Sequence, residues 1–370
     1  MTDGKSLFCA DGHVFENDAE IFEYLRPPFQ GRKELLRRDL FPSGDNWNRT
    51  ALSIIGQYQE GSTAERGGGE RGERGTAEQW LEFLDRARIE GTVLFSTGGL
   101  GFGQLREPQW ASALANAYNT WLYEKFLKVT PRLHGMALLP VQNVPDAVNE
   151  LRRCVNELGM VGALLVAGHR RPLGDSYYYP IYEAAQELET VLAVHAGGPG
   201  NRLDQFDRAI EARCLGHPTS QMIELTSLMF SGVFDRFPRL RFAFYEAGVA
   251  WAMFLIERMQ EAYEQWGVQA PDLKLAPKEH LTSGRIYFHA ELDEEILPYA
   301  VQQLGDEVLL YASDYPHLAP VKILHTLEQF KQRRDISDES KARILGQNAR
   351  RLYRLPAAAP QPTMAAAGAR

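Results

Sequence analysis

Eight short apolar runs recur along the chain, and polar or amphipathic segments lie between them. Near-continuous apolar runs of this length are typical of parallel strands that are buried on both faces of a sheet. The pattern therefore predicts strands over residues 6–14, 92–97, 132–140, 161–167, 191–197, 240–248, 285–291 and 308–315.

Two of the intervening segments show a clear helical pattern. In residues 145–159, apolar positions recur every three or four residues, a proline stands at the start and a glycine at the end, as in a capped amphipathic helix. Residues 179–189 are also amphipathic. Repeated strand–helix alternation favours the α/β class and a closed (β/α)8 TIM barrel, with a doubly wound open sheet as the alternative.

We expect one domain over residues 1–356, with a small insertion after the first strand. Residues 60–76 are rich in glycine, with glutamate and arginine interleaved, and we interpret them as a flexible insertion. An RGG-type nucleic-acid segment is disfavoured because the glutamates offset the arginines. Residues 357–370 are of low complexity and are predicted to form a disordered tail.

Composition excludes several classes of protein. Hydrophobic residues make up 44% and charged residues 24%, which is ordinary for a globular domain. A formal net charge of −8 argues against a nucleic-acid partner, because phosphate binding needs a basic surface. No apolar stretch is long enough for a membrane span or a signal peptide. Cys9, Cys154 and Cys214 form no CxxC pair, so we expect the reducing cytoplasm rather than disulfides.

Charged and imidazole side chains stand where several predicted strands end. Asp11 and His13 end the first strand, His195 lies in the fifth, Glu246 in the sixth and Asp314 in the eighth. The carboxyl ends of barrel strands meet on one face, where the catalytic sites of TIM barrels lie. Histidine, aspartate and glutamate together are ligands for zinc, manganese or another divalent ion. The sequence therefore predicts a divalent metal site.

Each of these residues also has a structural interpretation. The dipeptide Asp11-Gly12 is common in turns, and His195 could be a hydrogen-bonded core histidine. Asp314 could cap the next helix, and Glu246 could interact with the dipole of the helix that follows it. Four such coincidences, each at a strand end, are a weaker explanation than one shared site.

Several longer motifs point to a known family. The segments "ADGHVFE", "TVLFSTGGLGFG", "YNTWLYEKF", "AVHAGG", "SGVFDRFPRLRF" and "YASDYPH" resemble the amidohydrolase superfamily, and within it the amidohydrolase-2 branch of aminocarboxymuconate-semialdehyde decarboxylase-like enzymes. The quoted segments lie between Ala10 and His317, and the resemblance extends over about residues 9–353. The resemblance implies a TIM barrel of the metal-dependent hydrolase type and an enzyme that acts on a small carboxylic acid.

The resemblance also implies roles for individual residues. Asp11, His13, His195 and Asp314 match the family's metal ligands, for one ion that we expect to be zinc, with manganese as the alternative. The first-strand motif is DxH, where many superfamily members have HxH. A larger departure is Glu246, which stands in "YEAG" where the decarboxylases carry a histidine.

Two reactions fit this set of residues. The first is non-oxidative decarboxylation of an unsaturated or aromatic carboxylic acid, in which Asp314 or Glu246 supplies a proton. The second is hydrolysis or hydration of an amide, lactone or C–C bond by a metal-activated water, with Asp314 as base and Glu246 as second base or fifth ligand. We expect the lyase.

A dinucleotide enzyme is disfavoured because residues 99–103 read GxGxG and not GxGxxG. A purely binding or scaffold role is disfavoured because it would leave the predicted metal ligands without a purpose.

The remaining predictions concern residues that bind the substrate and the surface that binds a second copy of the chain. Arg170 or Arg171 could bind a carboxylate from the loop after the fourth strand, and His217, Trp251 and His317 could border the pocket. The segment 251–266 carries more apolar and aromatic residues than one core-facing stripe requires. We therefore expect a homo-oligomer, namely a dimer, as the resemblance also implies.

Overall fold

The computed structural model describes residues 7–37, 39–42, 75–167, 171–195, 206 and 208–356. Most of the predicted insertion (residues 60–74) and the whole predicted tail (357–370) lie outside the described residues. The last two residues predicted for the insertion lead into the first long helix: Thr76 is its N-cap, with its side chain accepting a hydrogen bond from the backbone N–H of Gln79. This capping box fixes where the helix begins.

Eight parallel strands form the sheet, in the order β1 to β8 of the sequence. Each predicted strand overlaps an observed one, and the sequential order confirms the barrel and excludes a doubly wound sheet. The strands are β1 Leu7–Val14, β2 Ile89–Ser96, β3 Leu133–Leu138, β4 Gly162–Val166, β5 Val191–His195, β6 Arg241–Tyr245, β7 Ile286–His289 and β8 Leu309–Leu310.

Backbone hydrogen bonds between the first and last strand segments bring the barrel close to closure. The N–H of Ala10 donates to the carbonyl of Tyr311 at 2.9 Å, and the N–H of His13 donates to the carbonyl of Tyr315 at 2.7 Å. The first strand and the segment after the last strand therefore lie side by side. This contact is what allows Asp11 and Asp314, about three hundred residues apart in sequence, to share one site.

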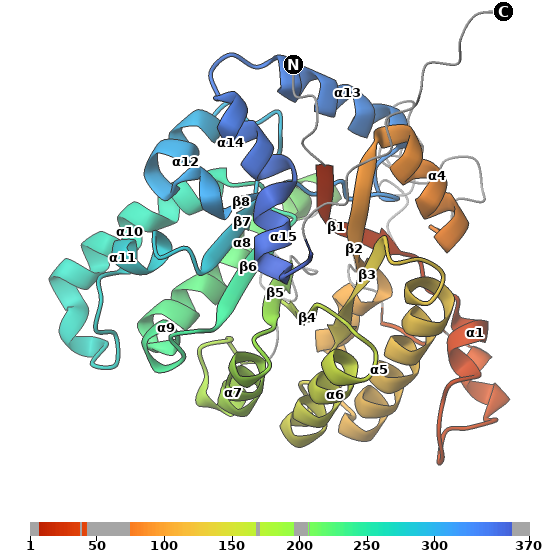
Figure 1. Cartoon of the computed structure of the whole chain (residues 1–370). Coiled ribbons are helices and arrows are strands. Elements are labelled where there is room, and N and C mark those ends of the chain that lie inside the picture. Colours follow the sequence, from red (N-terminus) through yellow and green to blue (C-terminus); the bar gives the residue numbers. More distant parts are fainter. Residues whose placement is uncertain are drawn as a thin grey trace, which may run out of the picture.

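Helices cover the outside of the barrel (Figure 1). Within the described part of the chain, none is long and apolar enough to cross a membrane. The α-helices are α1 Asp18–Phe22, α4 Ala77–Ala87, α5 Pro108–Leu122, α6 Val144–Asn156, α7 Tyr179–Glu187, α8 Ala209–Phe230, α9 Val233–Arg236, α10 Ala250–Trp266, α11 Pro277–Leu281, α12 Leu297–Leu304, α13 Pro320–Gln332, α14 Asp338–Ala342 and α15 Asn348–Tyr353. Short 3-10 turns cover Lys33–Arg37, Gly98–Gln104, Ser176–Tyr178, Gly267–Gln269 and Asp306–Val308, and π turns cover Tyr123–Leu127 and Arg343–Gln347.

A register shift interrupts β1 just before the predicted site. Cys9 pairs with Thr92 and Gly12 pairs with Leu94, so three steps along β1 oppose two steps along β2. Such a bulge bends the strand and redirects a side chain, and bulges are common beside active sites. Here it accompanies the segment that carries Asp11 and His13.

Gly12 is confined by the indole of Trp80. A Cβ at Gly12 would lie 2.2 Å from the Cη2 atom of Trp80, and the Trp80 indole N–H is fixed by a 2.9 Å hydrogen bond to the carbonyl of His13. We therefore predict that Gly12→Ala destabilises the fold by about 1–3 kcal/mol through overpacking. Urea unfolding measures this loss, and a Trp80→Leu background, which removes the clash, should reduce it. An equal loss in both backgrounds would contradict the explanation.

Candidate metal centre and adjoining pocket

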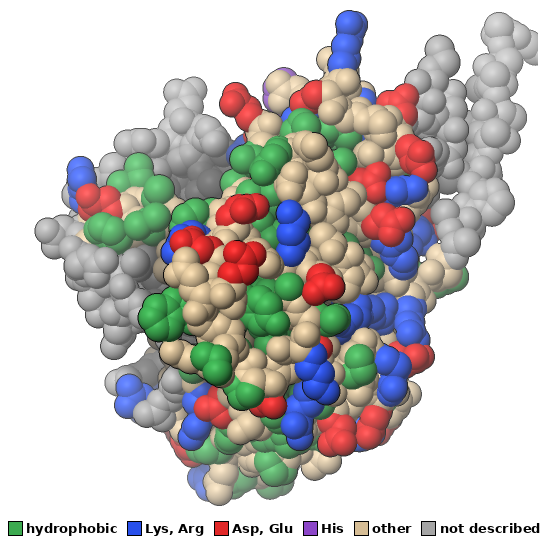
Figure 2. Space-filling view, turned by 90° about the vertical axis from the view of Figure 1, so that its left-hand side faces the viewer, with side chains coloured by type: hydrophobic (Ala, Val, Ile, Leu, Met, Phe, Trp, Pro, Cys, Tyr) green, Lys and Arg blue, Asp and Glu red, His purple; other side chains and the backbone are tan. Residues whose placement is uncertain are grey.

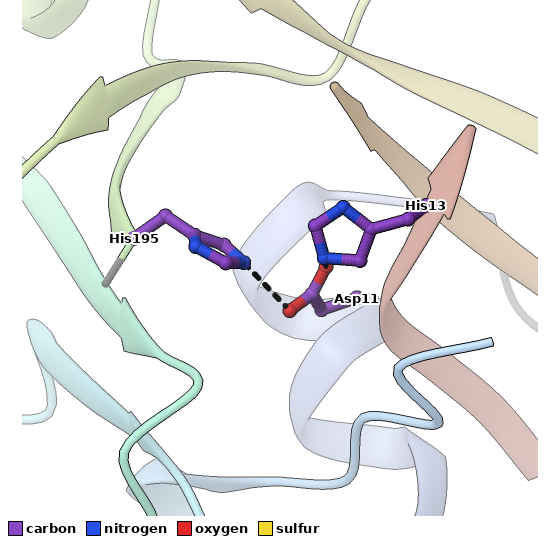
Figure 3. Close-up of side chains that lie close together, drawn as sticks. All are labelled: Asp11, His13 and His195. Carbon is purple, nitrogen blue, oxygen red and sulfur yellow. Dashed lines mark ion pairs between the residues drawn. The ribbon is translucent and has the colours of Figure 1, made fainter. Parts of the chain in front are cut away.

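Three buried side chains meet at the carboxyl end of the barrel. Asp11 and His13 leave β1 and His195 ends β5, and each is at most 1% exposed. The Nε2 atom of His13 lies 3.5 Å from Oδ1 of Asp11, and the Nε2 atom of His195 lies 3.4 Å from Oδ2 of the same carboxylate. Figure 3 shows the two imidazoles on either side of Asp11. The predicted convergence of these residues is observed.

Asp314 joins this group from the segment after β8. Its Oδ1 atom lies 3.6 Å from Nε2 of His13 and 2.7 Å from Nδ1 of His317. The other ring nitrogen of His317 is 3.0 Å from the hydroxyl of Thr97, which follows β2. Potential ligand atoms of His13, Asp314 and His317 all lie within 4.8 Å of one another. His317, predicted as a pocket residue, thus contacts the cluster itself.

Glu246 approaches the cluster from the opposite side of His195. It follows β6, and its Oε2 atom lies 3.4 Å from Nδ1 of His195, while Nε2 of that ring faces Asp11. A histidine that binds a metal through one nitrogen commonly gives its other N–H to a carboxylate. In this geometry Glu246 is placed to orient the ring of His195, and it also borders the pocket described below.

Burial shifts the protonation of these groups. The pKa of Asp11 is raised by burial, an effect that His195 opposes, and the pKa of His13 is held well below its usual value by burial. For His317, burial lowers the pKa, but Asp314 and Glu246 outweigh burial and the net shift is upward. The lowered pKa of His13 favours the neutral imidazole that binds a metal, whereas a cation would have to displace any proton that burial leaves on Asp11.

The described residues fit a divalent metal ion. Oδ1 of Asp11 and Nε2 of His13 are buried and have no hydrogen-bond partner among the described side chains and backbone. Buried polar atoms without partners are costly, and a cation between them would satisfy both. Asp11, His13 and His195 offer ligand atoms within 4.8 Å of one another, and their nitrogen and oxygen donors suit zinc or manganese.

A pocket of about 280 Å³ opens beside the cluster. Its wall is rich in carboxylates, and Lys322 is the single lysine or arginine among the described residues that line it. The lining residues are His217, Glu246, Glu291, Leu292, Asp293, Tyr311, Ala312, Ser313, Asp314, Leu318, Lys322, Ile323 and Thr326. The pocket therefore brings together His217, Glu246 and Asp314, three of the residues singled out in the sequence.

The other predicted substrate residues lie elsewhere. Trp251 packs in the core against Phe244 and Phe288, with ring centroids 5.9 and 5.7 Å away, and does not line the pocket. The guanidinium of Arg171 is half exposed and pairs with Asp175 at 3.1 Å. Arg170 lies outside the described residues. Of the predicted substrate residues, His217 lines the pocket, and His317 contacts Asp314, which also lines it.

The glycine-rich segment after β2 is a 3-10 turn, Gly98–Gln104. The backbone N–H of Gly98 donates to Oε2 of Glu16 at 2.8 Å, and the hydroxyl of Ser96 contacts the other oxygen of Glu16. Burial raises the pKa of Glu16 to about 6. An N–H group that already binds a carboxylate is a poor phosphate cradle, which agrees with the low expectation of a dinucleotide site.

Sequence reasoning missed His289, the last residue of β7. It is 2% exposed, and its Nδ1 atom accepts a hydrogen bond from the backbone N–H of Glu246 at 3.3 Å. The signal was present, because a histidine near the end of the predicted seventh strand stands in the same kind of position as His195.

Comparisons with known proteins place this geometry in a family. A family model described as "Amidohydrolase" matches residues 69–355. The chain is 27% identical over 280 residues to the 2-amino-3-carboxymuconate-6-semialdehyde decarboxylase of Dictyostelium discoideum, covering 73% of this chain and 74% of that protein. It is 26% identical over 301 residues to the gamma-resorcylate decarboxylase of Rhizobium sp. (strain MTP-10005), covering 75% and 87%.

A shorter match and a solved structure add to this picture. Over 151 residues, 38% of this chain and 41% of the relative, it is 31% identical to the 2-keto-4-carboxy-3-hexenedioate hydratase of Sphingobium sp. (strain NBRC 103272 / SYK-6). The 5-carboxyvanillate decarboxylase of Novosphingobium aromaticivorans DSM 12444, solved with manganese and 4-hydroxy-3-methoxy-5-nitrobenzoic acid, superposes with a TM-score of 0.72 at 20% identity, covering 96% of this chain and 97% of that one. At that identity the likeness concerns the fold.

Removal of the metal should destabilise the folded protein. An ion that binds only the native state stabilises it by RT ln(1 + [L]/Kd), which is about 2.7 kcal/mol at a free concentration of 100 Kd. We therefore predict about one divalent ion per chain by elemental analysis, and a lower Tm after chelation that recovers on adding back zinc or manganese. Asp11→Asn should abolish most of this difference. A metal-free protein with an unchanged Tm would contradict the assignment.

Proposed function

The chain belongs to the amidohydrolase family, and we propose that it is a metal-dependent carboxy-lyase that removes carbon dioxide, without oxidation, from an aromatic or unsaturated carboxylic acid. The observation that carries the proposal is the buried convergence of Asp11, His13 and His195 with Asp314, beside a pocket of about 280 Å³. Decarboxylases among the similar proteins support the reaction class.

Asp11, His13, His195 and Asp314 would hold the ion. Bound there, a divalent metal supplies positive charge that holds a substrate carboxylate and a neighbouring oxygen. We keep zinc as the expected metal, and manganese in the structure of a similar decarboxylase supports the alternative. Elemental analysis of protein purified without added metal distinguishes the two.

Decarboxylation also requires a proton at the carbon that loses the carboxylate. Asp314 and Glu246 both border the pocket, with side chains 17% and 19% exposed, so both can reach a bound molecule. His317 lies 2.7 Å from Asp314, which raises its pKa and keeps a proton next to that carboxylate. We propose that Asp314, supplied by His317, or Glu246 delivers the proton.

Hydration or hydrolysis is the second candidate. The partial match to a hydratase supports it, as does Glu246, a carboxylate that could remove a proton from water. The two reactions differ in product, because carbon dioxide is released only by the lyase. A screen of hydroxybenzoates and unsaturated dicarboxylates for carbon dioxide release and for addition of water therefore tests both, and the absence of release with every acid would count against the lyase.

Exchange of Glu246 separates its possible roles. Glu246→Gln keeps the size and hydrogen-bonding reach of the side chain but removes its charge and proton. If Glu246 transfers a proton, we predict a fall in kcat of about 10²–10⁴-fold with metal content still near one per chain. If it is a fifth metal ligand, metal content falls as well.

Asp314→Asn is the control for that experiment. It should abolish turnover, because Asp314 is assigned both a metal contact and a proton transfer. If Glu246→Gln retains wild-type kcat and full metal content, Glu246 is not part of the mechanism.

Arg171, His217 and His317 remain candidates for binding the substrate, together with Arg170. Arg171 could bind a substrate only if its ion pair with Asp175 were broken. We therefore favour His217, which lines the pocket. Trp251 is no longer proposed for this role, because its indole is buried against Phe244 and Phe288 and does not line the pocket.

We propose a homodimer that uses the exposed face of α10 and the turn after it. Phe254, Trp266 and Val268 are 62%, 60% and 90% exposed. Figure 2 shows this side of the molecule, where hydrophobic side chains lie between charged ones. Exposed aromatic residues of this kind are typical of protein interfaces.

The cytoplasm remains the expected compartment, and the free thiols of Cys9, Cys154 and Cys214 support it.

A charge placed on this face should dissociate the dimer. We predict that Phe254→Glu gives the monomer mass in light scattering at micromolar concentration, whereas the wild-type chain gives twice that mass. Val129→Glu is the matched control, since Val129 is 49% exposed in the loop after the π turn Tyr123–Leu127, and it should leave the mass unchanged. A wild-type monomer would contradict the proposal.

A further inference from the structure

The turn after β6 holds Glu246 in a strained backbone conformation. Its φ is +63°, in the left-handed region that non-glycine residues rarely adopt. Glutamate has no side-chain group suited to this conformation, unlike asparagine or aspartate, so the surrounding structure must impose it. We propose that His217 and His289 form a clamp on the peptide groups of Glu246, and act as positioning residues that direct its carboxylate towards His195 and the pocket.

His289 holds the N–H side of Glu246. It ends β7 and is 2% exposed, and its Nδ1 atom accepts the N–H of Glu246 at 3.3 Å. A ring nitrogen that accepts a hydrogen bond carries no proton, so the proton of neutral His289 lies on Nε2. That Nε2 atom is buried and has no hydrogen-bond partner among the described residues. Packing alone would not favour a buried imidazole here over an apolar residue.

His217 holds the carbonyl side of the same residue. It lies in α8, and its Nδ1 atom is 3.1 Å from the carbonyl oxygen of Glu246. A carbonyl only accepts, so Nδ1 of His217 must carry the proton and Nε2 is the acceptor in the neutral ring. The two histidines are thus expected in opposite tautomers. This difference follows from the contacts alone and does not depend on the reaction.

The rest of the turn is anchored by Glu294. Its carboxylate accepts the N–H groups of Val249 at 2.9 Å and Ala250 at 3.1 Å. Gly248 has a φ of +62°, and a Cβ there would lie 2.5 Å from Oε1 of Glu294. The chain is therefore fixed three residues after Glu246 as well as at Glu246. With the backbone held at both places, the direction of the Cα–Cβ bond of Glu246 is set.

The consequence of the clamp is the direction of the Glu246 side chain. Its Oε2 atom lies 3.4 Å from Nδ1 of His195. If φ relaxed to the ordinary negative region, Cβ would point elsewhere and this approach would be lost. A catalytic or orienting group displaced by about 1 Å can cost about 10²-fold in rate, so the clamp matters to any reaction that uses Glu246.

Stability cycles test the clamp without any substrate. Glu246→Gly should raise Tm by about 2 °C in the wild-type background, because glycine accepts a positive φ without strain. In His289→Leu or His217→Leu proteins the same change should give no gain, because the strain is no longer imposed. An equal gain in all three backgrounds would overturn the proposal. So would finding both rings in the same neutral tautomer by NMR of protein with ¹⁵N-labelled histidine.

A kinetic arm tests the positioning role, and it rests on the proposed function. Asparagine can place an amide oxygen or nitrogen close to the position of Nδ1, so His289→Asn should retain most of kcat. His289→Leu should lose about 10-fold or more. In a Glu246→Gln background, His289→Leu should have no further effect on kcat. Additive losses would overturn the assignment of His289 as acting through Glu246. His217 also lines the pocket, so its part in the clamp is tested by the stability cycles and by its tautomer.

His280 is the matched control. It is a buried histidine on α11 that is hydrogen-bonded to Asp235 at 3.0 Å and lies outside the site. His280→Asn should lower Tm and leave kcat and the Glu246→Gly gain unchanged. If the wild-type protein turns over no carboxylic acid, the proposed function fails. The tautomers and the stability cycles then still test whether His217 and His289 hold the backbone of Glu246.

Discussion

Asp11 takes part both in the contact that brings β1 and the segment after β8 together and in the candidate metal centre. Its carboxylate lies between His13 and His195, while its carbonyl oxygen accepts the N–H groups of Ser313 and Asp314 at 3.2 and 3.3 Å. Its backbone thus adds to the closing hydrogen bonds of Ala10 and His13, and its side chain belongs to the site. A carboxylate that is 1% exposed is costly to keep charged unless a cation or hydrogen-bond donors compensate for it. The position of Asp11 thus links the stability of the barrel to occupation of its site.

Two of the five described non-glycine residues with a positive φ are carboxylates that face this site. Glu246, with a φ of +63°, directly follows β6, and Asp314, with a φ of +52°, lies four residues after β8. An extended strand would send alternate side chains inward and outward, whereas a left-handed residue turns the chain sharply and directs its side chain at the strand tip. The ring of His317 donates a hydrogen bond to the carboxylate of Asp314. At Glu246, the carbonyl oxygen accepts from His217 and the N–H donates to His289, and we propose that these contacts hold its conformation.

The sequence predicted the barrel because strand burial on both faces leaves a continuous apolar pattern, as in β5 and β6. It also predicted that Asp11, His13, His195 and Asp314 lie close together, because the carboxyl ends of barrel strands meet on one face. It did not predict the bulge at Cys9–Gly12, since a bulge changes no residue type. The sequence left Trp251 open between pocket wall and core, and the structure places its indole against Phe244 and Phe288. His289 was missed because only the fold shows that its partner is the backbone of Glu246.

Charge balance explains how this site tolerates a glutamate where the family pattern has histidine. Asp11, Asp314 and Glu246 bring three negative charges when ionised, and a divalent ion offsets two of them. The protonated form of His317, whose pKa Asp314 and Glu246 raise in spite of burial, would offset the third. A charged Glu246 therefore favours a proton on His317, 2.7 Å from Asp314. That proton would be available for the substrate carbon, which is the transfer that the proposed decarboxylation requires.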